Sequence, residues 1–390
     1  MVSDMRWDNL RLDEPLDTRD GEDLFAAGRR DRALPLIERG AVARTFDTPG
    51  FRDMTFFEVQ AKSVVNRVPE ASRMPFRWTI NPYRGCQHAC TYCFARNSHT
   101  YLDLDAGADF NTRVVVKVNA PELVRKKMAS PSWAGEHIAM GTNVDCYQRA
   151  EGRYQLMPGI IGALRDAANP FSILTKGTLI LRDIELLAEA AEVTEVGLNV
   201  SAGFVDKDLW RSIEPGTPAP GRRLEACATL NERGLRCGVL MGPVVPFLSD
   251  SPAQLGETVR QIAETGAGHV MPIVLHLRPG TREWFFSWLR AQHPGLVEAY
   301  LELYGHGAYA PKAYQNRIAG QVRELAEKHG IGRPRPGFGH GTLPPRSATA
   351  KRPVAAERPA TAEHPAALLT SQVPVPHRPP PAPPEQLTLL

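Results

Sequence analysis

Short apolar runs alternate with longer, charge-bearing segments through the middle of the chain. Apolar runs bounded by turn residues are typical of buried strands, and several of the segments between them open on Pro or Asp, as helices often do. The expected strands are Phe76–Tyr83, His137–Asn143, Phe171–Lys176, Val193–Ser201, Leu235–Val245 and Gly268–Leu277, and the expected helices lie near Pro121–Ala129, Pro158–Ala168, Asp183–Glu192, Arg222–Glu232 and Pro252–Glu264. This alternation predicts βα units around a parallel sheet.

Six such units over residues 71–280, joined by right-handed crossovers, predict an α/β fold, a partial (β/α)6 TIM-type barrel rather than the closed eight-stranded one. An open arc leaves a lateral mouth wide enough for a large substrate. Because βα loops converge at the C-terminal ends of parallel strands, functional residues are expected at that edge.

The flanking segments differ in composition from this domain. Residues 1–70 mix charge, Gly and Pro, with short helical runs around Leu24–Gly40, and are expected to form an N-terminal extension. Residues 341–390 are rich in Pro and Ala, with almost no aromatic residue, which predicts a disordered tail. Between barrel and tail, residues 281–340 should form C-terminal helices at Arg282–Arg290, Pro294–Tyr304 and Tyr314–Lys328.

Net charge and the lengths of apolar runs bear on two questions, namely whether the protein binds nucleic acid and whether it enters a membrane. The 390 residues include 46 Lys and Arg against 43 Asp and Glu, a net charge of +3. This balance lacks the basic footprint of an avid nucleic-acid binder but does not exclude nucleic acid. Because the N-terminus has no apolar signal-peptide core and no apolar run reaches membrane-spanning length, we expect a soluble, cytoplasmic protein with no membrane partner.

Three of the six cysteines, Cys86, Cys90 and Cys93, are spaced C-x3-C-x2-C just past the first expected strand. A cubane iron–sulfur cluster held by three thiolates keeps one iron open, whereas a structural metal site closes its shell with protein groups. The alternative is a zinc or redox thiol cluster with a distant fourth ligand such as His88. The other cysteines show no second cluster spacing, so no disulfide framework is expected, and an oxygen-sensitive cluster fits a reducing cytoplasm.

This motif, with Tyr92 directly before its last cysteine, resembles the signature of the radical S-adenosylmethionine (SAM) superfamily. The resemblance implies a [4Fe–4S] cluster on the three cysteines, SAM chelated by the free iron, and Tyr92 among the cofactor-binding residues. It also implies a one-electron donor of flavodoxin or ferredoxin type. SAM would be cleaved to a 5′-deoxyadenosyl radical that takes a hydrogen atom from substrate, while the protein orients the reactants and excludes water.

Short polar residues follow the second expected strand at the same edge. Thr142, Asn143 and Asp145 could hold an ammonium group, and in the radical SAM superfamily this position contacts the amino group of SAM. An ordinary strand-to-helix turn with an N-cap is the alternative.

Three further residues are candidates for the SAM pocket. Lys176 ends the third expected strand and could pair with the SAM carboxylate as a point charge, and Ser201 ends the fourth. Arg223 and the loop Glu214–Pro218 are expected near the ribose, with an ordinary surface loop as the alternative.

Additional motifs resemble radical SAM proteins related to spore photoproduct lyase, over roughly residues 50–330. They are, in order, Asn81–Cys86, Gly141–Asp145, Leu174–Gly177, Arg182–Asp183 and Pro243–Pro246. The runs Met54–Val59, Met74–Thr79 and His276–Gly280 resemble an uncharacterised actinobacterial branch of that group. The resemblance is specific for the cofactor and much less so for the substrate.

One position departs from the lyase pattern. The lyase uses a hydrogen-donating cysteine a few residues before the Asp of its second-strand motif, and the matching residue here is Thr142. Cys146 instead follows Asp145, so either Cys146 is a catalytic hydrogen donor from a shifted position or the reaction differs. Cys227 and Cys237 are expected to be buried small apolar residues.

Three functions stay open at this point. The first is a radical SAM enzyme acting on a nucleic-acid lesion or modified base, and the second is a radical SAM enzyme acting on a peptide or small metabolite. The third is a non-enzymatic iron–sulfur or zinc module. The pocket of Asp145 and Lys176 argues against the third, because a structural metal site has no need of a SAM-holding set on two other strands.

The last residues suggest a partner. Gln386, Leu387, Leu389 and Leu390 resemble the short peptide by which bacterial repair and replication proteins hold the DNA sliding clamp, with a chance apolar end as the alternative. The leucines would fill an apolar groove, Gln386 would hydrogen-bond at its edge, and the Pro-rich linker would provide reach. Clamp binding would favour a nucleic-acid substrate.

Overall fold

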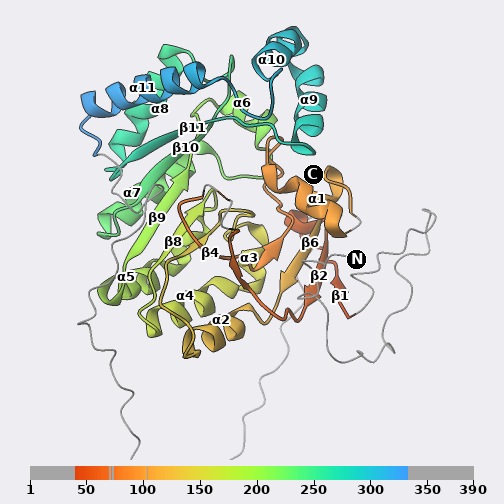
Figure 1. Ribbon diagram of the computed structural model, residues 1–390, viewed down its shortest axis with the longest axis vertical. Coiled ribbons are helices and arrows are strands. Elements are labelled where there is room, and N and C mark those ends of the chain that lie inside the picture. The colour runs from red at the N-terminus through yellow and green to blue at the C-terminus, as the bar shows by residue number, and fades with distance from the viewer. Residues whose placement is uncertain (1–39, 70–71, 73, 103, 333–390) are drawn as a thin grey trace, which may run out of the picture. The chain divides into compact units, whose positions relative to one another are not determined.

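In the computed structural model, two β-sheets organise the described residues, which are 40–69, 72, 74–102 and 104–332 (Figure 1). The larger sheet has the strand order β11-β10-β9-β8-β7-β4-β3 and the smaller sheet the order β1-β2-β6-β5. The strands are β1 (Val42–Arg44), β2 (Thr55–Val59), β3 (Val65–Arg67), β4 (Trp78–Ile80), β5 (Tyr83–Arg84), β6 (Arg113–Lys117), β7 (Ile138–Met140), β8 (Phe171–Thr175), β9 (Val196–Ser201), β10 (Gly238–Val244) and β11 (Val270–Val274).

Most helices lie in the chain between consecutive strands of the larger sheet or after its last strand. They are α1 (Ala108–Thr112), α2 (Ala120–Ala129), α3 (Arg149–Tyr154), α4 (Leu156–Asp166), α5 (Ile184–Val193), α6 (Lys207–Ile213), α7 (Pro220–Glu232), α8 (Pro252–Glu264), α9 (Thr281–Gln292), α10 (Val297–Leu303) and α11 (Lys312–Lys328), with 3-10 turns η3 (Pro49–Phe51), η4 (Phe94–Leu102), η5 (Thr178–Asp183) and η6 (Pro294–Leu296). Within the described residues, no helix is long and apolar enough to cross a membrane.

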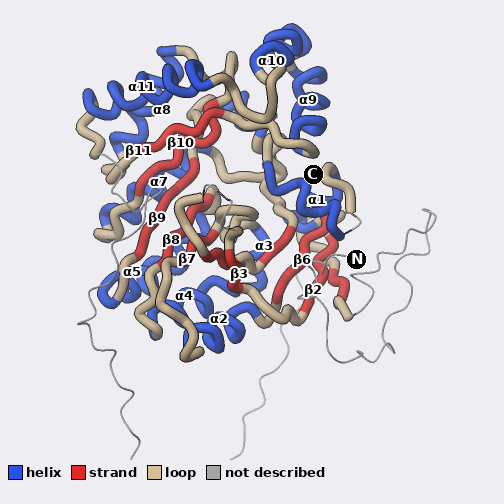
Figure 2. The backbone as a smooth tube through the Cα atoms, in the orientation of Figure 1, coloured by secondary structure: helices blue, strands red, loops and turns tan. Residues whose placement is uncertain are grey.

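Six strands of the larger sheet run parallel, in the order of the chain. β4 pairs with β7, and the pairing continues through β8, β9 and β10 to β11, while β3 pairs antiparallel with β4 at the edge. Figure 2 shows helices α5, α7 and α8 along the outer side of this curved sheet. The prediction of a partial (β/α)6 TIM-type barrel is confirmed, with all six expected strands and five expected helices in place.

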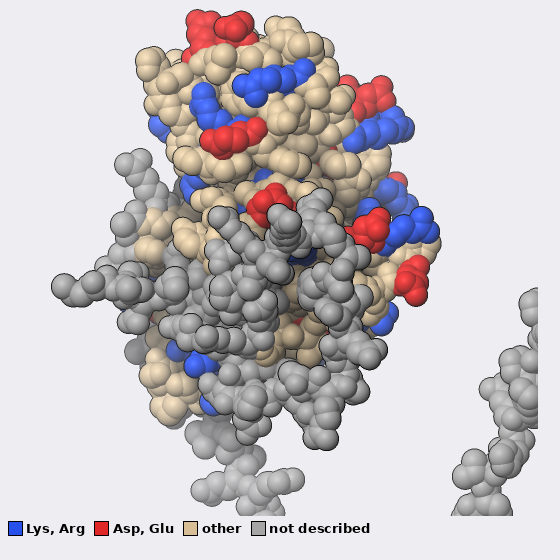
Figure 3. All heavy atoms as spheres, turned by 90° about the vertical axis from the view of Figure 1, so that its right-hand side faces the viewer, with Lys and Arg blue, Asp and Glu red and all other residues tan. Residues whose placement is uncertain are grey.

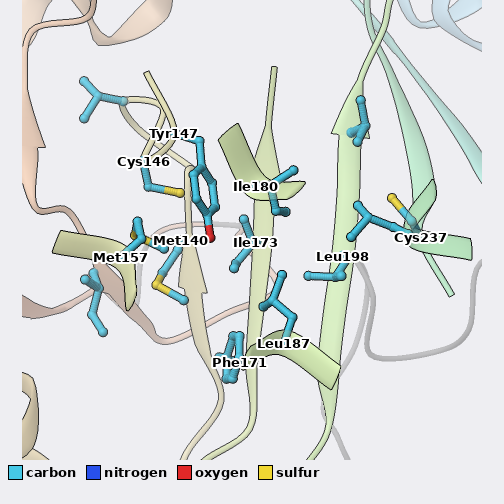
Figure 4. Packing of buried hydrophobic residues seen from close by; sticks show 14 of the residues in the cluster. Met140, Cys146, Tyr147, Met157, Phe171, Ile173, Ile180, Leu187, Leu198 and Cys237 are labelled. Atoms are coloured by element: carbon cyan, nitrogen blue, oxygen red, sulfur yellow. The ribbon is translucent and has the colours of Figure 1, made fainter. Parts of the chain in front are cut away.

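Local sequence explains several of these elements. Pro stands in the first turn of α2, α7 and α8, where its missing N–H is not needed. Ser251 and Gln254 form a capping box at the start of α8, a contact worth about 1 kcal/mol. The core beneath the sheet is built from alternating strand residues such as Met140, Ile173 and Leu198, against which helical side chains pack (Figure 4). Each such buried side chain contributes about 1.5–3 kcal/mol.

The smaller sheet was not predicted from the sequence. β1 and β2 lie within residues 1–70, yet β2 pairs in parallel with β6, on the far side of the cysteine motif. The expected strand Phe76–Tyr83 is also divided, because the chain leaves the larger sheet after β4 and enters the smaller one at β5. Most of the expected N-terminal helical run and the whole tail, including Gln386–Leu390, lie outside the described residues.

Candidate active site

Buried polar side chains from other parts of the chain hold the cysteine loop, Gly85–Cys93. Gln148 Oε1 accepts from the backbone N–H of Gln87 at 3.1 Å, and Gln148 Nε2 donates to the carbonyl of Gly85 at 3.0 Å. The fully buried guanidinium of Arg96 donates to the carbonyl of Cys90 through Nε at 3.2 Å and Nη2 at 2.9 Å. The loop backbone is thus fixed while all six cysteines of the chain stay free of disulfides.

A cavity of about 190 Å³ opens beside this loop, at the C-terminal edge of the larger sheet. Gly141 directly follows β7 at this edge with a φ of +75°, and a Cβ there would lie 1.8 Å from the carbonyl oxygen of Leu174. Only glycine allows this close approach of the chain after β7 to β8. The cavity is lined by eight of the site residues predicted from the sequence, which are Cys86, Cys90, Cys93, Tyr92, Asn143, Asp145, Lys176 and Ser201.

Burial keeps the three thiols protonated. Burial, with a further contribution from the charge of Glu214, raises the pKa of Cys90 to about 12. Burial and the charge of Asp145 raise the pKa of Cys86 well above its ordinary value. The pKa of Cys93 is also raised by burial. Because a coordinated thiol is deprotonated, binding of iron at these residues would release their protons.

Asp145 joins the ends of β7 and β8 to the cysteine loop. Its Oδ1 accepts from Thr175 Oγ1 at 2.6 Å and from the backbone N–H of Tyr147 at 2.9 Å, and its Oδ2 accepts from the backbone N–H of Lys176 at 2.6 Å. His88 Nδ1 lies 3.4 Å from Oδ2, although burial lowers the pKa of His88 and disfavours its cationic form. Asp145 therefore positions the loops as well as lining the cavity.

Lys176 connects three strands at the cavity wall. Its Nζ donates to Ser201 Oγ at 2.7 Å and to the carbonyl of Gly242 at 3.1 Å, and lies 3.3 Å from Glu214 Oε1. The ammonium group is therefore held at a fixed place beside the cysteine loop, with only 13% of its side chain exposed.

Glu214, the first residue of the loop expected near the ribose, is a buried carboxylate with a network of partners that the sequence did not predict. It accepts hydrogen bonds from Tyr92 Oη and Arg223 Nη2 and pairs with Lys176. Burial alone would raise its pKa, but Arg223 and Lys176 together hold that pKa at about 2, so Glu214 is ionised at neutral pH. Its loop rests on the cysteine loop, since the backbone N–H of Gly216 donates to the carbonyl of His88 at 3.1 Å.

Three predicted site residues lie outside the cavity lining. Thr142 is half-buried in the turn after β7. Arg223 is buried behind the wall, where Nη1 donates to the carbonyl of Ser201 at 2.9 Å, so it supports the wall. Cys146 is fully buried in the core beside Met140 (Figure 4), and burial raises its pKa. This placement argues against Cys146 as a hydrogen donor to a substrate in the cavity, because its thiol faces packed side chains.

The chain matches the model of the radical SAM superfamily over residues 80–261. With the relatives described next, this match shows that the chain belongs to the radical SAM superfamily and is a radical SAM enzyme. Members of this superfamily use a [4Fe–4S] cluster and SAM, which are accordingly its cofactors.

Individual relatives extend over most of the chain. It is 48% identical over 322 residues to the uncharacterized protein Rv2578c of Mycobacterium tuberculosis, a match that covers 82% of this chain and 95% of that protein. It is 32% identical over 247 residues to the uncharacterized protein MJ0683 of Methanocaldococcus jannaschii, covering 63% and 82% of the two chains.

Among solved structures, the fold is similar to that of spore photoproduct lyase complexed with dinucleoside spore photoproduct. The TM-score is 0.54 at 13% identity, covering 78% of this chain and 86% of the lyase. A lyase variant with bound AdoMet and the same dinucleoside gives a TM-score of 0.52, covering 68% and 77% of the two chains at 13% identity. This likeness establishes a shared fold.

The residues of the cavity fit the two cofactors. Cys86, Cys90 and Cys93 supply free thiols, which are the ligands of iron–sulfur clusters. Lys176 and Asp145 place one cation and one anion in the same lining, which matches the carboxylate and the ammonium group of SAM.

Proposed function

We propose that Cys86, Cys90 and Cys93 hold the [4Fe–4S] cluster and that the enzyme abstracts a hydrogen atom from a nucleic-acid lesion or modified base. The observation that best supports the cofactor assignment is that three free thiols share one cavity with Lys176 and Asp145. When bound, the cluster and SAM would supply one-electron reductive chemistry that generates a hydrogen-abstracting carbon radical, with Cys86, Cys90 and Cys93 holding the cluster.

The chain's own residues bind and orient the reactants. Lys176 would pair with the SAM carboxylate, and Asn143 and Asp145 would hold its ammonium group. Glu214 keeps the Lys176 ammonium from swinging into solvent, since the two lie 3.3 Å apart in a buried network. Apolar lining residues, among them Leu240, exclude water from the site.

The nucleic-acid substrate is supported by the fold shared with spore photoproduct lyase, which was solved with a dinucleoside spore photoproduct. The open arc of strands, which ends at β11 without closing on β4, is compatible with a large substrate. On the part of the face in Figure 3 where described residues are visible, basic and acidic side chains lie close to one another, so this proposal does not rest on a basic patch there.

Anaerobic reconstitution tests the cluster assignment. Iron and sulfide near four each per chain are expected for the wild-type protein. Triple alanine substitution at Cys86, Cys90 and Cys93 should abolish the brown absorbance, whereas Cys227→Ala, which alters a cysteine outside the cavity, should retain it. Iron bound by the triple variant would contradict the assignment.

Hydrogen abstraction from a deuterated substrate tests the substrate class. Nucleic-acid, peptide and metabolite fractions from cells grown in heavy water are incubated with the reduced wild-type enzyme and unlabelled SAM, and the 5′-deoxyadenosine formed is analysed by mass spectrometry. Deuterium in the 5′-deoxyadenosine formed with the nucleic-acid fraction is the expected result. Deuterium taken only from peptides or metabolites would contradict the substrate proposal and leave the cofactor assignment standing.

We further propose an electron donor of flavodoxin or ferredoxin type. We also propose a cytoplasmic location, which the free state of all six cysteines supports.

The proposed clamp contact through Gln386, Leu387, Leu389 and Leu390 can be tested with a peptide covering residues 374–390. Micromolar binding to the sliding clamp of the source organism, abolished by Gln386→Ala with Leu389→Ala, is expected. No binding at about 100 μM, where an interaction of only about −5.5 kcal/mol would half-saturate, would contradict it.

A further inference from the structure

Aromatic and basic side chains form an ordered group at the mouth of the cavity. This group, the rim platform, consists of Phe94, His276, Arg278 and Tyr309. The rings of His276 and Tyr309 are stacked, with centroids 5.5 Å apart and planes at 24°, and the Phe94 ring centroid lies 5.8 Å from that of His276. Phe94 and His276 also line the cavity, so the platform continues its wall outward.

Arg278 and the backbone hold the platform in place. Its guanidinium lies 5.7 Å from the centroid of Phe94, and Nη2 donates to Tyr309 Oη at 2.9 Å. An antiparallel bridge joins His276 to Tyr309, and the backbone N–H of Leu277 donates to the carbonyl of Ala308 at 2.7 Å. Burial, with a smaller contribution from Arg278, lowers the pKa of His276 to about 4, so its ring is neutral and does not repel the guanidinium.

Two of the three rings of the platform are exposed, and so is a neighbouring apolar residue. Tyr309 is 54% exposed, Phe94 is 36% exposed, and the adjacent lining residue Ile273 is 37% exposed. Contiguous exposed apolar groups mark binding sites more often than isolated ones. Because the rings are already ordered by their mutual contacts, a planar ligand would stack on them at little cost in side-chain entropy.

We propose that the rim platform binds an unpaired base of a single-stranded nucleic acid, with the base stacked on the ring series and Arg278 beside a flanking phosphate. This inference rests on the proposed function and narrows its substrate class. Every nucleobase has a π-face, so stacking on aromatic rings needs no basic patch and tolerates any sequence. A paired base inside a duplex cannot present its face to the platform unless it first unstacks.

The test uses full-length reconstituted protein and a single-stranded oligothymidylate that carries one 2-aminopurine, whose fluorescence is quenched on stacking. Tyr309→Leu should weaken binding by about five- to a hundredfold and remove the quenching. Tyr309→Phe keeps the ring and should bind within about twofold of wild type. Tyr101→Leu is the matched control, because Tyr101 is 52% exposed and belongs neither to the cavity lining nor to the platform.

Salt dependence isolates the role of Arg278. Arg278→Gln should reduce the slope of log Kobs against log salt by about 0.7, as expected for one lost phosphate contact to a single strand. The same strand annealed to its complement should bind more weakly than the single strand. Iron content and thermal unfolding of each variant show that it is folded and loaded.

Equal affinity of wild type and Tyr309→Leu for the strand would overturn the inference, and so would tighter binding of the duplex. Binding of the peptide Gly-Trp-Gly with the same dependence on Tyr309, in the absence of strand binding, would assign the platform to peptides instead. The proposed function is measured separately, from deuterium that the wild-type enzyme transfers from deuterated nucleic acid to 5′-deoxyadenosine. Transfer without any dependence of strand binding on Tyr309 would therefore remove this inference alone.

Discussion

Replacement of Glu214 by glutamine removes the carboxylate that pairs with Lys176 at the cavity wall and with Arg223 behind it. The pKa of Glu214 falls from its ordinary value of 4.5 to about 2, through Arg223 and Lys176 and against the effect of burial. Since one pKa unit corresponds to 1.36 kcal/mol, ionised Glu214 stabilises the folded protein by about 3 kcal/mol at pH 7. Glu214→Gln should lose about this much, as expected when one partner of a buried ion pair is removed.

The same pKa gives the pH dependence. Because the folded-state pKa lies below the unfolded one, the contribution of Glu214 is complete above about pH 4.5 and is lost as the pH falls toward about 2. Of the roughly 3 kcal/mol, about 2 should disappear between pH 5 and pH 3. The difference in free energy of unfolding between wild type and Glu214→Gln should shrink accordingly.

Urea unfolding of the metal-free protein, followed by far-ultraviolet circular dichroism under reducing conditions, measures these quantities. Glu257→Gln is the control, because the pKa of Glu257 is also held at about 2, by hydrogen bonds from Arg260 and Gln261, but on an exposed face of α8. An exposed pair is screened by solvent, so this variant should unfold like wild type. If Glu214→Gln behaves like Glu257→Gln, or costs the same at pH 3 as at pH 7, the buried network does not stabilise the fold.

Three further outcomes are expected. Lys176→Ala should weaken SAM binding by roughly ten- to a hundredfold in calorimetry of the reconstituted enzyme, because a charge-assisted contact worth about 1.5–3 kcal/mol is lost; unchanged affinity would place the SAM carboxylate elsewhere. Gly141→Ala should lower the unfolding temperature by several degrees, because its Cβ would lie 1.8 Å from a carbonyl oxygen, while Gly50→Ala, with nothing within 4 Å, should not. Cys146→Ser should cost about 1–3 kcal/mol in urea unfolding, more than Cys146→Ala, because it buries a hydroxyl in the core; the reverse order would show that Cys146 meets polar groups.

The larger sheet could be predicted because its strands are apolar runs and its helices carry local start signals, such as Pro252 after Ser251. The smaller sheet could not, since its strands have two to five residues and pair stretches that lie up to 58 positions apart, as Thr55 and Arg113 do. Such pairings depend on tertiary packing and leave no local period in the sequence.

In the candidate site too, some residues could be predicted from local sequence and others only from the folded structure. The spacing of the cysteines and the polar residues at the ends of strands predicted eight of the 20 residues that line the cavity. The sequence left open whether Cys146 is a hydrogen donor, because periodicity does not show that Asp145 faces the cavity while the next side chain turns into the core. The loop that begins at Glu214 was expected at the pocket, but the role of its carboxylate was not predicted, because the partners Tyr92 and Arg223 come together only in the folded chain.

Only Asn81 and Pro82 separate β4, in the larger sheet, from β5, in the smaller one, and the cysteine loop begins directly after β5. The thiols therefore follow a strand of the smaller sheet, whereas Lys176 follows a strand of the larger one. The candidate site is assembled from two sheets, and the two residues between β4 and β5 limit how far the thiols can lie from the larger sheet. Each residue inserted there would lengthen that limit by about 3.3 Å without changing any side chain that lines the cavity.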